Sequence, residues 1–184
     1  MDDETAATPR RNYAKTRERL LLSAYKAFSQ RGYAGTGIRE IANDAGVASS
    51  LVAKYFGGKA ALFEEALVHG IYRNSLFARD KKNFGEIMSK LIATADDGHL
   101  TTTMTLALAD PESRAIAQKI LRRHVIEPLA EWLGPPDAFV RAQHLYAVMA
   151  GFSMQIGDFA LSREVAPQSV KWLARTLQDI VDGK

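Results

Sequence analysis

Several features that would place this chain in other protein classes are missing. Its 184 residues contain no cysteine, which excludes disulfide bonds, thiolate zinc sites and thiol catalysis. No run approaches the roughly 18 consecutive apolar residues that a membrane span needs. The first ten residues, MDDETAATPR, are acidic and polar rather than basic and apolar. We therefore expect a cytoplasmic protein that is neither secreted nor inserted in a membrane.

The motifs of common enzymes are missing as well. The four histidines lie far apart in the sequence and lack a carboxylate or second histidine at the spacing of a metal site: His69, His99, His124 and His144. The chain has no G-x-S-x-G, Walker or Gly-rich dinucleotide motif. We expect no catalytic residue, no metal and no cofactor, and hence no enzyme.

What the chain does have is helical periodicity. Apolar residues make up 47% of it and recur at helical spacing, with almost no β-branched alternation. The pattern predicts an all-α fold with helices over residues 17–30, 36–45, from about 49, 59–77, 84–95, 100–109, 111–132, 137–159 and 167–181. We expect Asp137 to cap the helix that it precedes, and Pro128 to bend its helix because it removes one backbone donor near His124.

Residues 36–59, TGIREIANDAGVASSLVAKYFGGK, predict two short helices around a tight turn. We expect Thr36 to cap the first helix and Gly46 to end it, because positive φ costs little only for glycine. The second helix buries one apolar face and exposes or half-exposes Ser49, Ser50, Ala53, Lys54 and Tyr55. Such short polar side chains and one cation fit a DNA major groove. Two ordinary helices of a helical domain are the alternative interpretation.

Basic residues are concentrated around this segment. Residues 9–60 carry ten Lys or Arg and three acids, a net charge of +7, whereas the chain totals +3 and residues 61–184 sum to −1. A basic face on a small helical unit indicates phosphate binding, with a solvated surface as the alternative. Arg10 and Arg11 either enter a minor groove as a flexible arm or belong to a tail without contacts.

The residues of this region also carry a family resemblance. It rests on Phe28, Gly32, Tyr33, Thr36, Ile38, Ile41, Ala42, Ala45, Gly46 and Val47, followed by Tyr55, Phe56, Lys59 and Leu62. At these positions the chain resembles the DNA-binding domain of TetR-family transcriptional regulators, of the TetR/AcrR type. The match covers about fifty residues, and the remainder resembles the family only in being helical and of the right length.

The resemblance implies an N-terminal three-helix helix-turn-helix domain and a C-terminal helical ligand-binding and dimerisation core. Its expected boundaries are a flexible arm over residues 1–11, the DNA-binding domain over 12–58 and the ligand-binding and dimerisation domain over 59–184. In that family each subunit of a homodimer places one helix-turn-helix in the major groove of double-stranded DNA.

Family roles can be carried over position by position. The resemblance implies that Thr36, Tyr55 and Lys59 hold phosphates, that Ser49, Ser50 and Lys54 face the bases, and that Arg39 completes the DNA-binding set. Two residues depart from the family pattern. Ala48 replaces a common serine cap, which removes about 1 kcal/mol of helix stability unless Ser49 caps instead. Ala53 replaces a common aromatic or histidine and can offer only a methyl contact to thymine.

The last two predicted helices are apolar enough to need a partner surface. A second copy of the pair, packed as a four-helix bundle about a twofold axis, would bury them. The expected dimer interface is Leu145, Met149, Phe152, Ile156, Leu173 and Leu177. A purely intramolecular core is the alternative.

A ligand pocket is expected in the C-terminal core. The candidate wall residues are Leu76, Met88, Met104, Leu108, Leu121 and Phe152, although side chains at helical spacing equally form ordinary core. The predicted function is a homodimeric repressor that a small apolar ligand of unspecified identity releases from a palindromic operator. The alternatives are a helical small-molecule or protein-binding sensor that no longer reads DNA, and a small helical enzyme, which the lack of paired catalytic groups disfavours.

Overall fold

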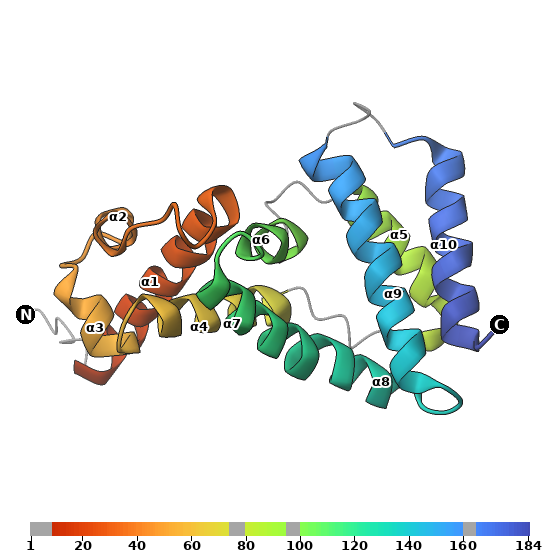
Figure 1. Cartoon of the computed structure of the whole chain (residues 1–184), viewed down its shortest axis with the longest axis horizontal. Helices are drawn as coiled ribbons and strands as arrows, with labels where there is room; N and C mark the ends of the chain where they lie inside the picture. The colour runs from red at the N-terminus through yellow and green to blue at the C-terminus, as the bar shows by residue number, and fades with distance from the viewer. Residues whose placement is uncertain (1–8, 74–79, 95–99, 160–164) are drawn as a thin grey trace, which may run out of the picture.

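The computed structural model describes residues 9–73, 80–94, 100–159 and 165–184, and within these ranges all regular secondary structure is helical (Figure 1). The helices are α1 (Pro9–Arg31), α2 (Ile38–Asp44), α3 (Ser50–Phe56), α4 (Lys59–Arg73), η1 (Lys81–Asn83), α5 (Phe84–Thr94), α6 (Leu100–Ala107), α7 (Pro111–Leu121), η2 (Arg122–Ile126), α8 (Glu127–Leu133), α9 (Ala138–Ser153), η3 (Met154–Asp158) and α10 (Pro167–Asp182). The all-α prediction is confirmed, and no described helix has the length and apolar character to span a membrane.

The buried side chains form two separate cores. The first takes residues from α1–α4 and also from α6 and α7, including Met104 and Ile120. The second takes residues from α5, α8, α9 and α10. Leu121 and Tyr146 pack against both. The first core therefore extends well past the expected boundary at residue 58, because α6 and α7 pack on the helix-turn-helix unit.

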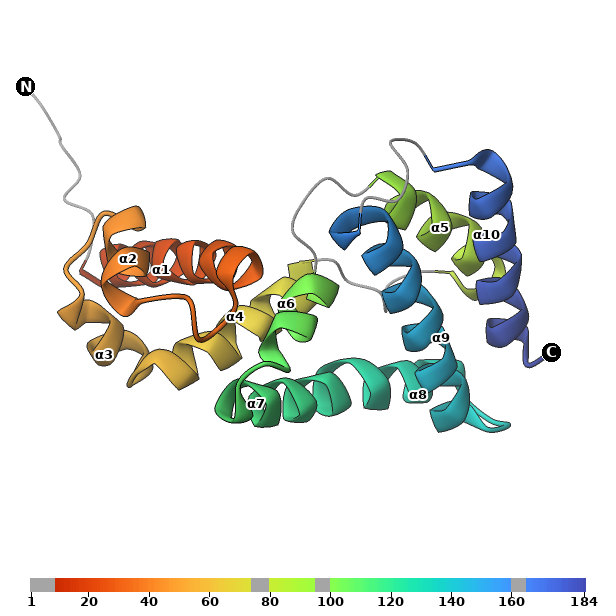
Figure 2. The same ribbon diagram turned by 45° about the horizontal axis from the view of Figure 1, so that its top comes forward.

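One rod of helix joins the two cores. The segment α7–η2–α8 runs without a break from the first core to the second, as Figure 2 shows. Its middle, η2, is a π turn, and Pro128 follows within the first turn of α8. Pro128 has no N–H for the carbonyl of His124, so the regular α-helical bond cannot form there. The lost bond coincides with the π turn, and the helix continues on both sides of it.

The ends of several predicted helices need correction. α1 begins at Pro9, so the expected arm over residues 1–11 overlaps the helix, and residues 1–8 lie outside the described ranges. The predicted helix over 59–77 is described to Arg73. Asp137 stands at the cap position of α9, but its side chain makes no cap hydrogen bond and its φ is 48°. The backbone of Asp137 therefore begins α9 without the predicted carboxylate cap.

Glycine sets the distance between α5 and α10. A Cβ added to Gly85 would lie 2.1 Å from the carbonyl oxygen of Ala174, so only glycine allows this approach. The Gly85 N–H donates to the Gln178 side-chain oxygen at 3.1 Å. This contact holds α5 and α10 together in the second core. The second core lies at the opposite end of the molecule from α3 (Figure 1).

Candidate nucleic-acid interface

The turn between α2 and α3 follows the predicted chemistry. Gly46 has φ +64°, the left-handed conformation that favours glycine. The N–H of Gly46 donates to the carbonyl of Asn43 at 3.0 Å, and the N–H of Val47 donates to the carbonyl of Ala42 at 2.9 Å. These two bonds form a Schellman ending, which satisfies the last carbonyls of α2 and directs the chain into α3. Arg19 of α1 donates to the Gly46 carbonyl at 3.4 Å and braces the turn.

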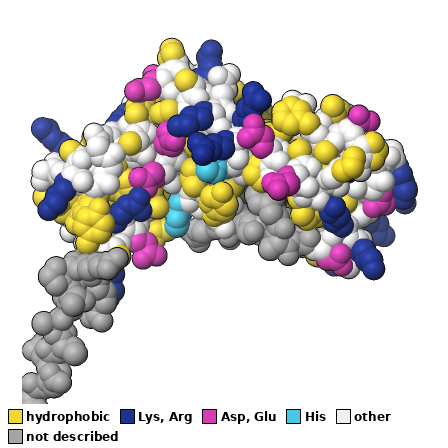
Figure 3. Space-filling view, turned by 90° about the horizontal axis from the view of Figure 1, so that it is seen from below, with side chains coloured by type: hydrophobic (Ala, Val, Ile, Leu, Met, Phe, Trp, Pro, Cys, Tyr) yellow, Lys and Arg dark blue, Asp and Glu magenta, His cyan; other side chains and the backbone are white. Residues whose placement is uncertain are grey.

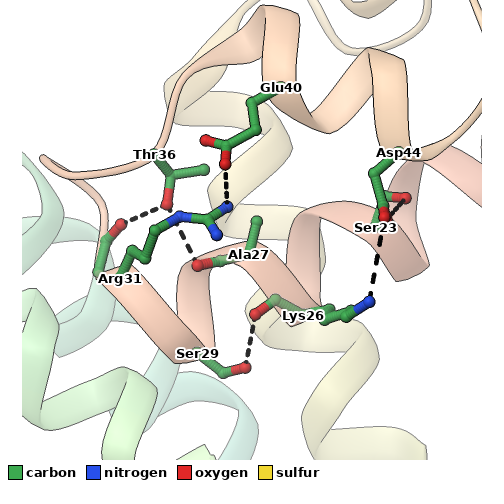
Figure 4. Close-up of polar contacts among 9 residues, drawn as sticks. Ser23, Lys26, Ala27, Ser29, Arg31, Thr36, Glu40 and Asp44 are labelled. Carbon is green, nitrogen blue, oxygen red and sulfur yellow. Dashed lines mark hydrogen bonds and ion pairs between the residues drawn. The ribbon is translucent and has the colours of Figure 1, made fainter.

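Thr36 does not take its predicted place. Its side chain is only 2% exposed. The hydroxyl donates toward two carbonyls at the end of α1, Gly32 at 2.7 Å and Ala27 at 3.2 Å (Figure 4). The N-cap of α2 is Gly37, with no side-chain hydrogen bond. Thr36 therefore closes the end of α1 instead of capping α2, and its hydroxyl is engaged within the protomer.

The exposed face of α3 carries the residues expected to face DNA. Ser49, Ser50, Ala53 and Lys54 are all exposed, whereas Val52 and Phe56 are buried in the first core. Ser49 occupies the N-cap position, but its hydroxyl makes no cap hydrogen bond. The hydroxyls of Ser49 and Ser50 thus remain available to an outside partner, and the possible compensation for Ala48 is not made.

The N-terminal DNA-binding unit, α1–α3 with the start of α4, is called the head below. Its cations fall into two groups. One group forms ion pairs: Arg17 with Glu65, Lys26 with Asp44, and Arg31 with Glu40. The second and third pairs join α1 to α2 (Figure 4). By contrast, no described residue forms an ion pair or hydrogen bond with the side chain of Lys15, Arg39 or Lys54. The net charge of +7 thus overstates the phosphate-binding capacity, because several of its cations are engaged in holding the fold together.

The face seen in Figure 3 shows why charge alone does not locate the interface. Acidic and basic side chains alternate across the middle of this face, with histidine between them. Elsewhere between α7 and α4, Lys119 pairs with Glu64 at 2.6 Å. A surface of alternating sign does not attract phosphate, so the unpaired cations of α2 and α3 carry more information than the total.

Tyr55 is held by a residue that sequence reasoning missed. The ring of Tyr13, near the start of α1, meets the Tyr55 ring edge to face with centroids 4.6 Å apart. Tyr13 is 46% exposed and Tyr55 is half-buried. The contact places the first turns of α1 beside α3. The expected start of this helix at residue 17 had left Tyr13 and Lys15 outside it.

Lys59 lies at the start of α4 and partly covers Tyr33. Its Nζ is 4.4 Å from the centre of the Tyr33 ring, and the Tyr33 hydroxyl donates to the Glu112 carboxylate at 2.7 Å. Burial, and then the hydrogen bond to Glu112 with its negative charge, raise the pKa of the Tyr33 phenol well above its ordinary value. The hydroxyl stays protonated and donates. Glu112 is 79 residues away in sequence, so no local pattern could have indicated this contact.

The expected dimer-interface residues belong to the protomer's own core. Leu145, Leu173 and Leu177 are 0% exposed, and Met149 and Phe152 are 7% and 8% exposed. Ile156 is half-buried against the same core. A side chain with no exposed surface has none to offer a partner, so the expectation is corrected for Leu145, Leu173 and Leu177, whereas Ile156 stays a predicted contact. Exposed apolar residues of this end include Val140, Ala147 and Gly151 of α9 and Trp172 of α10, and also Leu91, Phe139 and Phe159.

The expected pocket residues are not gathered in one place. Met88 and Phe152 belong to the second core and Met104 to the first, while Leu121 packs against both. Leu108 is 52% exposed at the end of α6, and Leu76 lies outside the described residues. Since the described members divide between two cores, a ligand that touched Met88 and Met104 would have to lie at the junction of the cores.

Sequence comparisons identify both parts of the chain. A family model described as "Bacterial regulatory proteins, tetR family" matches residues 20–66, and one described as "Tetracyclin repressor-like, C-terminal domain" matches residues 84–181. A Bacillus subtilis (strain 168) protein named "Probable HTH-type transcriptional regulator YttP" is 41% identical over 49 residues, which are 27% of this chain and 24% of that protein. That likeness is confined to the helix-turn-helix region.

Solved structures share the fold over nearly the whole length. Reduced NemR of E. coli has a TM-score of 0.68 and 22% identity, with 90% of this chain and 97% of that chain covered. A transcriptional regulator from Rhodococcus sp. Rha1 has a TM-score of 0.60 and 24% identity, with 91% and 94% covered. NalD, the secondary repressor of the MexAB-OprM multidrug efflux pump in Pseudomonas aeruginosa, has a TM-score of 0.63 and 18% identity, with 94% and 96% covered. With its helix-turn-helix geometry and both family matches in place, this chain belongs to the TetR family of bacterial regulatory proteins and is a DNA-binding transcriptional regulator.

Proposed function

We propose that the protein is a homodimeric, sequence-specific repressor that binds a palindromic operator through α3 and leaves it when a small apolar ligand enters the C-terminal region. The observation that carries the DNA-reading part is the exposed face of α3. Ser49, Ser50, Ala53 and Lys54 lie on it, and the fold uses none of them internally. Family membership supports the class of activity.

The side chains of α3 divide into base-facing and phosphate-facing groups. Ser49, Ser50 and Lys54 face the bases in this proposal, because hydroxyls bond to several base edges and lysine bonds to guanine O6 and N7. The Ala53 methyl contacts a thymine methyl. Tyr55, held by Tyr13, takes a phosphate position together with the cations at the edges of the face: Lys15, Arg39 and Lys59.

Dimerisation is proposed through the exposed surface of α9 and α10. Val140, His144, Ala147 and Gly151 follow one another at helical spacing on the exposed side of α9, and a Cβ at Gly151 would meet nothing within 4 Å. Trp172 of α10 stacks on Phe152 with centroids 6.3 Å apart and remains 57% exposed. Small residues allow two helices to approach closely, and an exposed tryptophan is typical of interface centres. A twofold axis through this surface places one α3 at each end of the dimer.

Ligand release requires that the ligand prefer the conformation that does not bind DNA. A hundredfold loss of operator affinity needs about 2.7 kcal/mol of differential binding, which a modest apolar ligand can supply. The junction of the two cores, where Leu121 and Tyr146 pack against both, is the proposed place for it. A ligand bound there contacts both the helices that support α3 and those that form the dimer surface.

Binding selection on random duplex DNA tests the proposal. The purified protein is incubated with the library at near-physiological salt, and the retained DNA is sequenced. Enrichment of an inverted repeat is the expected result. Retention without an enriched sequence would show binding to the DNA backbone alone, and the reading as a sensor that no longer recognises an operator would replace the proposal.

A further inference from the structure

Tyr33 lies where three parts of the chain meet. Its ring, in the turn between α1 and α2, stacks on Phe28 of α1 with centroids 6.1 Å apart and tilts against Phe63 of α4 at 5.1 Å. The residue is 7% exposed. Because aromatic neighbours hold the ring in place, the position of its hydroxyl is fixed as well.

Charged groups are bound at both the edge and the face of this ring. The hydroxyl donates to the carboxylate of Glu112, in the first turn of α7, at 2.7 Å. The ammonium of Lys59, the first residue of α4, lies over the ring face at 4.4 Å from its centre. One buried side chain thus connects α7 to the basic residue expected on a DNA phosphate.

The first turn of α7 is in turn tied to α6. The hydroxyl of Ser113, which is 0% exposed, donates to the carbonyl of Ala107 at the end of α6 at 2.9 Å. Asp110 caps α7 by accepting the N–H of Ser113, also at 2.9 Å. These bonds join the end of α6 to the turn of α7 that carries Glu112.

We propose that Glu112 is a positioning residue for DNA binding: through Tyr33 it holds the Lys59 ammonium where the DNA backbone can reach it, so that the position of α7 sets the affinity of the head for DNA. The inference rests on the proposed function, because it takes Lys59 as a phosphate contact. It adds a connection through which the C-terminal region controls one identified contact with DNA.

A second contact between the same two helices provides the matched control. Lys119 of α7 pairs with Glu64 of α4, but their side chains are 55% and 35% exposed. Exposed pairs contribute little to stability because water screens them. If any contact between α7 and α4 served equally well, Lys119→Ala would weaken DNA binding as much as a change at Glu112.

The test measures affinity for the duplex selected above, as a function of salt, with full-length protein. Tyr33→Phe keeps the ring under Lys59 and removes only the hydroxyl, and Glu112→Ala removes the acceptor. Each should weaken binding about threefold to tenfold, which is the range for loss of one net hydrogen bond. Glu112→Gln retains an acceptor oxygen and should bind like the wild type, as should Lys119→Ala.

A double-mutant cycle separates positioning from loss of stability. In a Lys59→Ala background, Tyr33→Phe and Glu112→Ala should cause no further loss, because the residue they position is absent. Wild-type affinity in both single variants would overturn the inference. Equal losses with and without Lys59 would also overturn it, since those losses come from general destabilisation. Thermal unfolding verifies that each variant folds. If Glu112→Ala does not fold, the affinities of Tyr33→Phe and Glu112→Gln are compared instead.

Failure of the inference is distinct from failure of the proposed function. If Lys59→Ala lowers the slope of log affinity against log salt by about 0.9 while Tyr33→Phe changes nothing, Lys59 contacts phosphate and only the role of Glu112 is rejected. If Lys59→Ala leaves the slope unchanged, the phosphate contact itself is absent and both statements about Lys59 fall.

Discussion

Two surfaces at opposite ends of the protomer have no partner among the residues that the structure describes, and their chemistry differs. The face of α3 presents two hydroxyls, a methyl group and an ammonium, from Ser49, Ser50, Ala53 and Lys54. The face of α9 and α10 presents Val140, Ala147, Gly151 and Trp172. A polar, cationic surface suits hydrated phosphates and base edges, whereas an apolar one is stabilised by burial against another apolar surface. The difference supports the proposal that DNA binds the first surface and a second copy of the chain binds the other.

The largest effect is expected next to the apolar surface rather than on it. Leu145 is 0% exposed inside the second core, so Leu145→Ala should lower the free energy of unfolding by about 2–5 kcal/mol. Urea denaturation at two protein concentrations measures the loss. A loss below about 1 kcal/mol would mean that Leu145 is not packed in the protomer, and the corrected assignment of the apolar face would be wrong.

Trp172 tests the apolar surface itself. Trp172→Ala removes a side chain that is 57% exposed, so the protomer should remain folded. The dissociation constant of the dimer should rise about thirtyfold. Sedimentation equilibrium measures the dissociation constant. Leu22→Ala is the control, because Leu22 is also exposed, at 40%, but lies on α1. Equal behaviour of the two variants would remove the α9–α10 face from the interface.

Arg39 tests the cations at the edge of the polar surface. Arg39→Ala should lower the slope of log affinity against log salt by about 0.9, because one fewer cation releases counterions from the DNA phosphates. Lys26 is the matched control, since it pairs with Asp44 between α1 and α2 and should not contribute. Filter binding over a series of salt concentrations gives both slopes. If the two variants have the same slope, the distinction between paired and unpaired cations does not hold.

The smallest effect concerns the contact that joins the head to α7. The pKa of Tyr33 is raised in the folded protein, so its contribution to stability is complete below its unfolded pKa of about 10 and is lost as pH rises toward the folded value. The thermal unfolding midpoint should therefore fall less between pH 8 and pH 11 in Tyr33→Phe than in the wild type. Equal decreases would show that the phenol is not held by burial and Glu112.

The head could be predicted from sequence in detail because its signals are local. Gly46 ends α2 in the predicted left-handed conformation, and the exposed residues of α3 are the predicted ones. Thr36 is the exception. Its sequence position suits a helix cap, but two carbonyls at the end of α1 compete for its hydroxyl, and they are adjacent only after the chain has folded.

The C-terminal region could be predicted only in outline. Periodicity located α9 and α10, but it did not say which helices cover their apolar stripe. Leu145 and Leu177 are covered by α5 and α8 of the same protomer, which leaves the opposite face exposed. The pocket residues divided between two cores for the same reason, since spacing along a helix reveals a face and not its neighbours.

The most direct test of the central claim exchanges one side chain on α3 and repeats the binding selection. Wild-type protein should enrich an inverted repeat, and Lys54→Gln should change the preferred base at one position in each half-site, from guanine toward adenine, with the spacing unchanged. The symmetric change would show that two copies of α3 read the two half-sites. An identical enriched sequence from both proteins would contradict the account, because Lys54 would then take no part in reading bases.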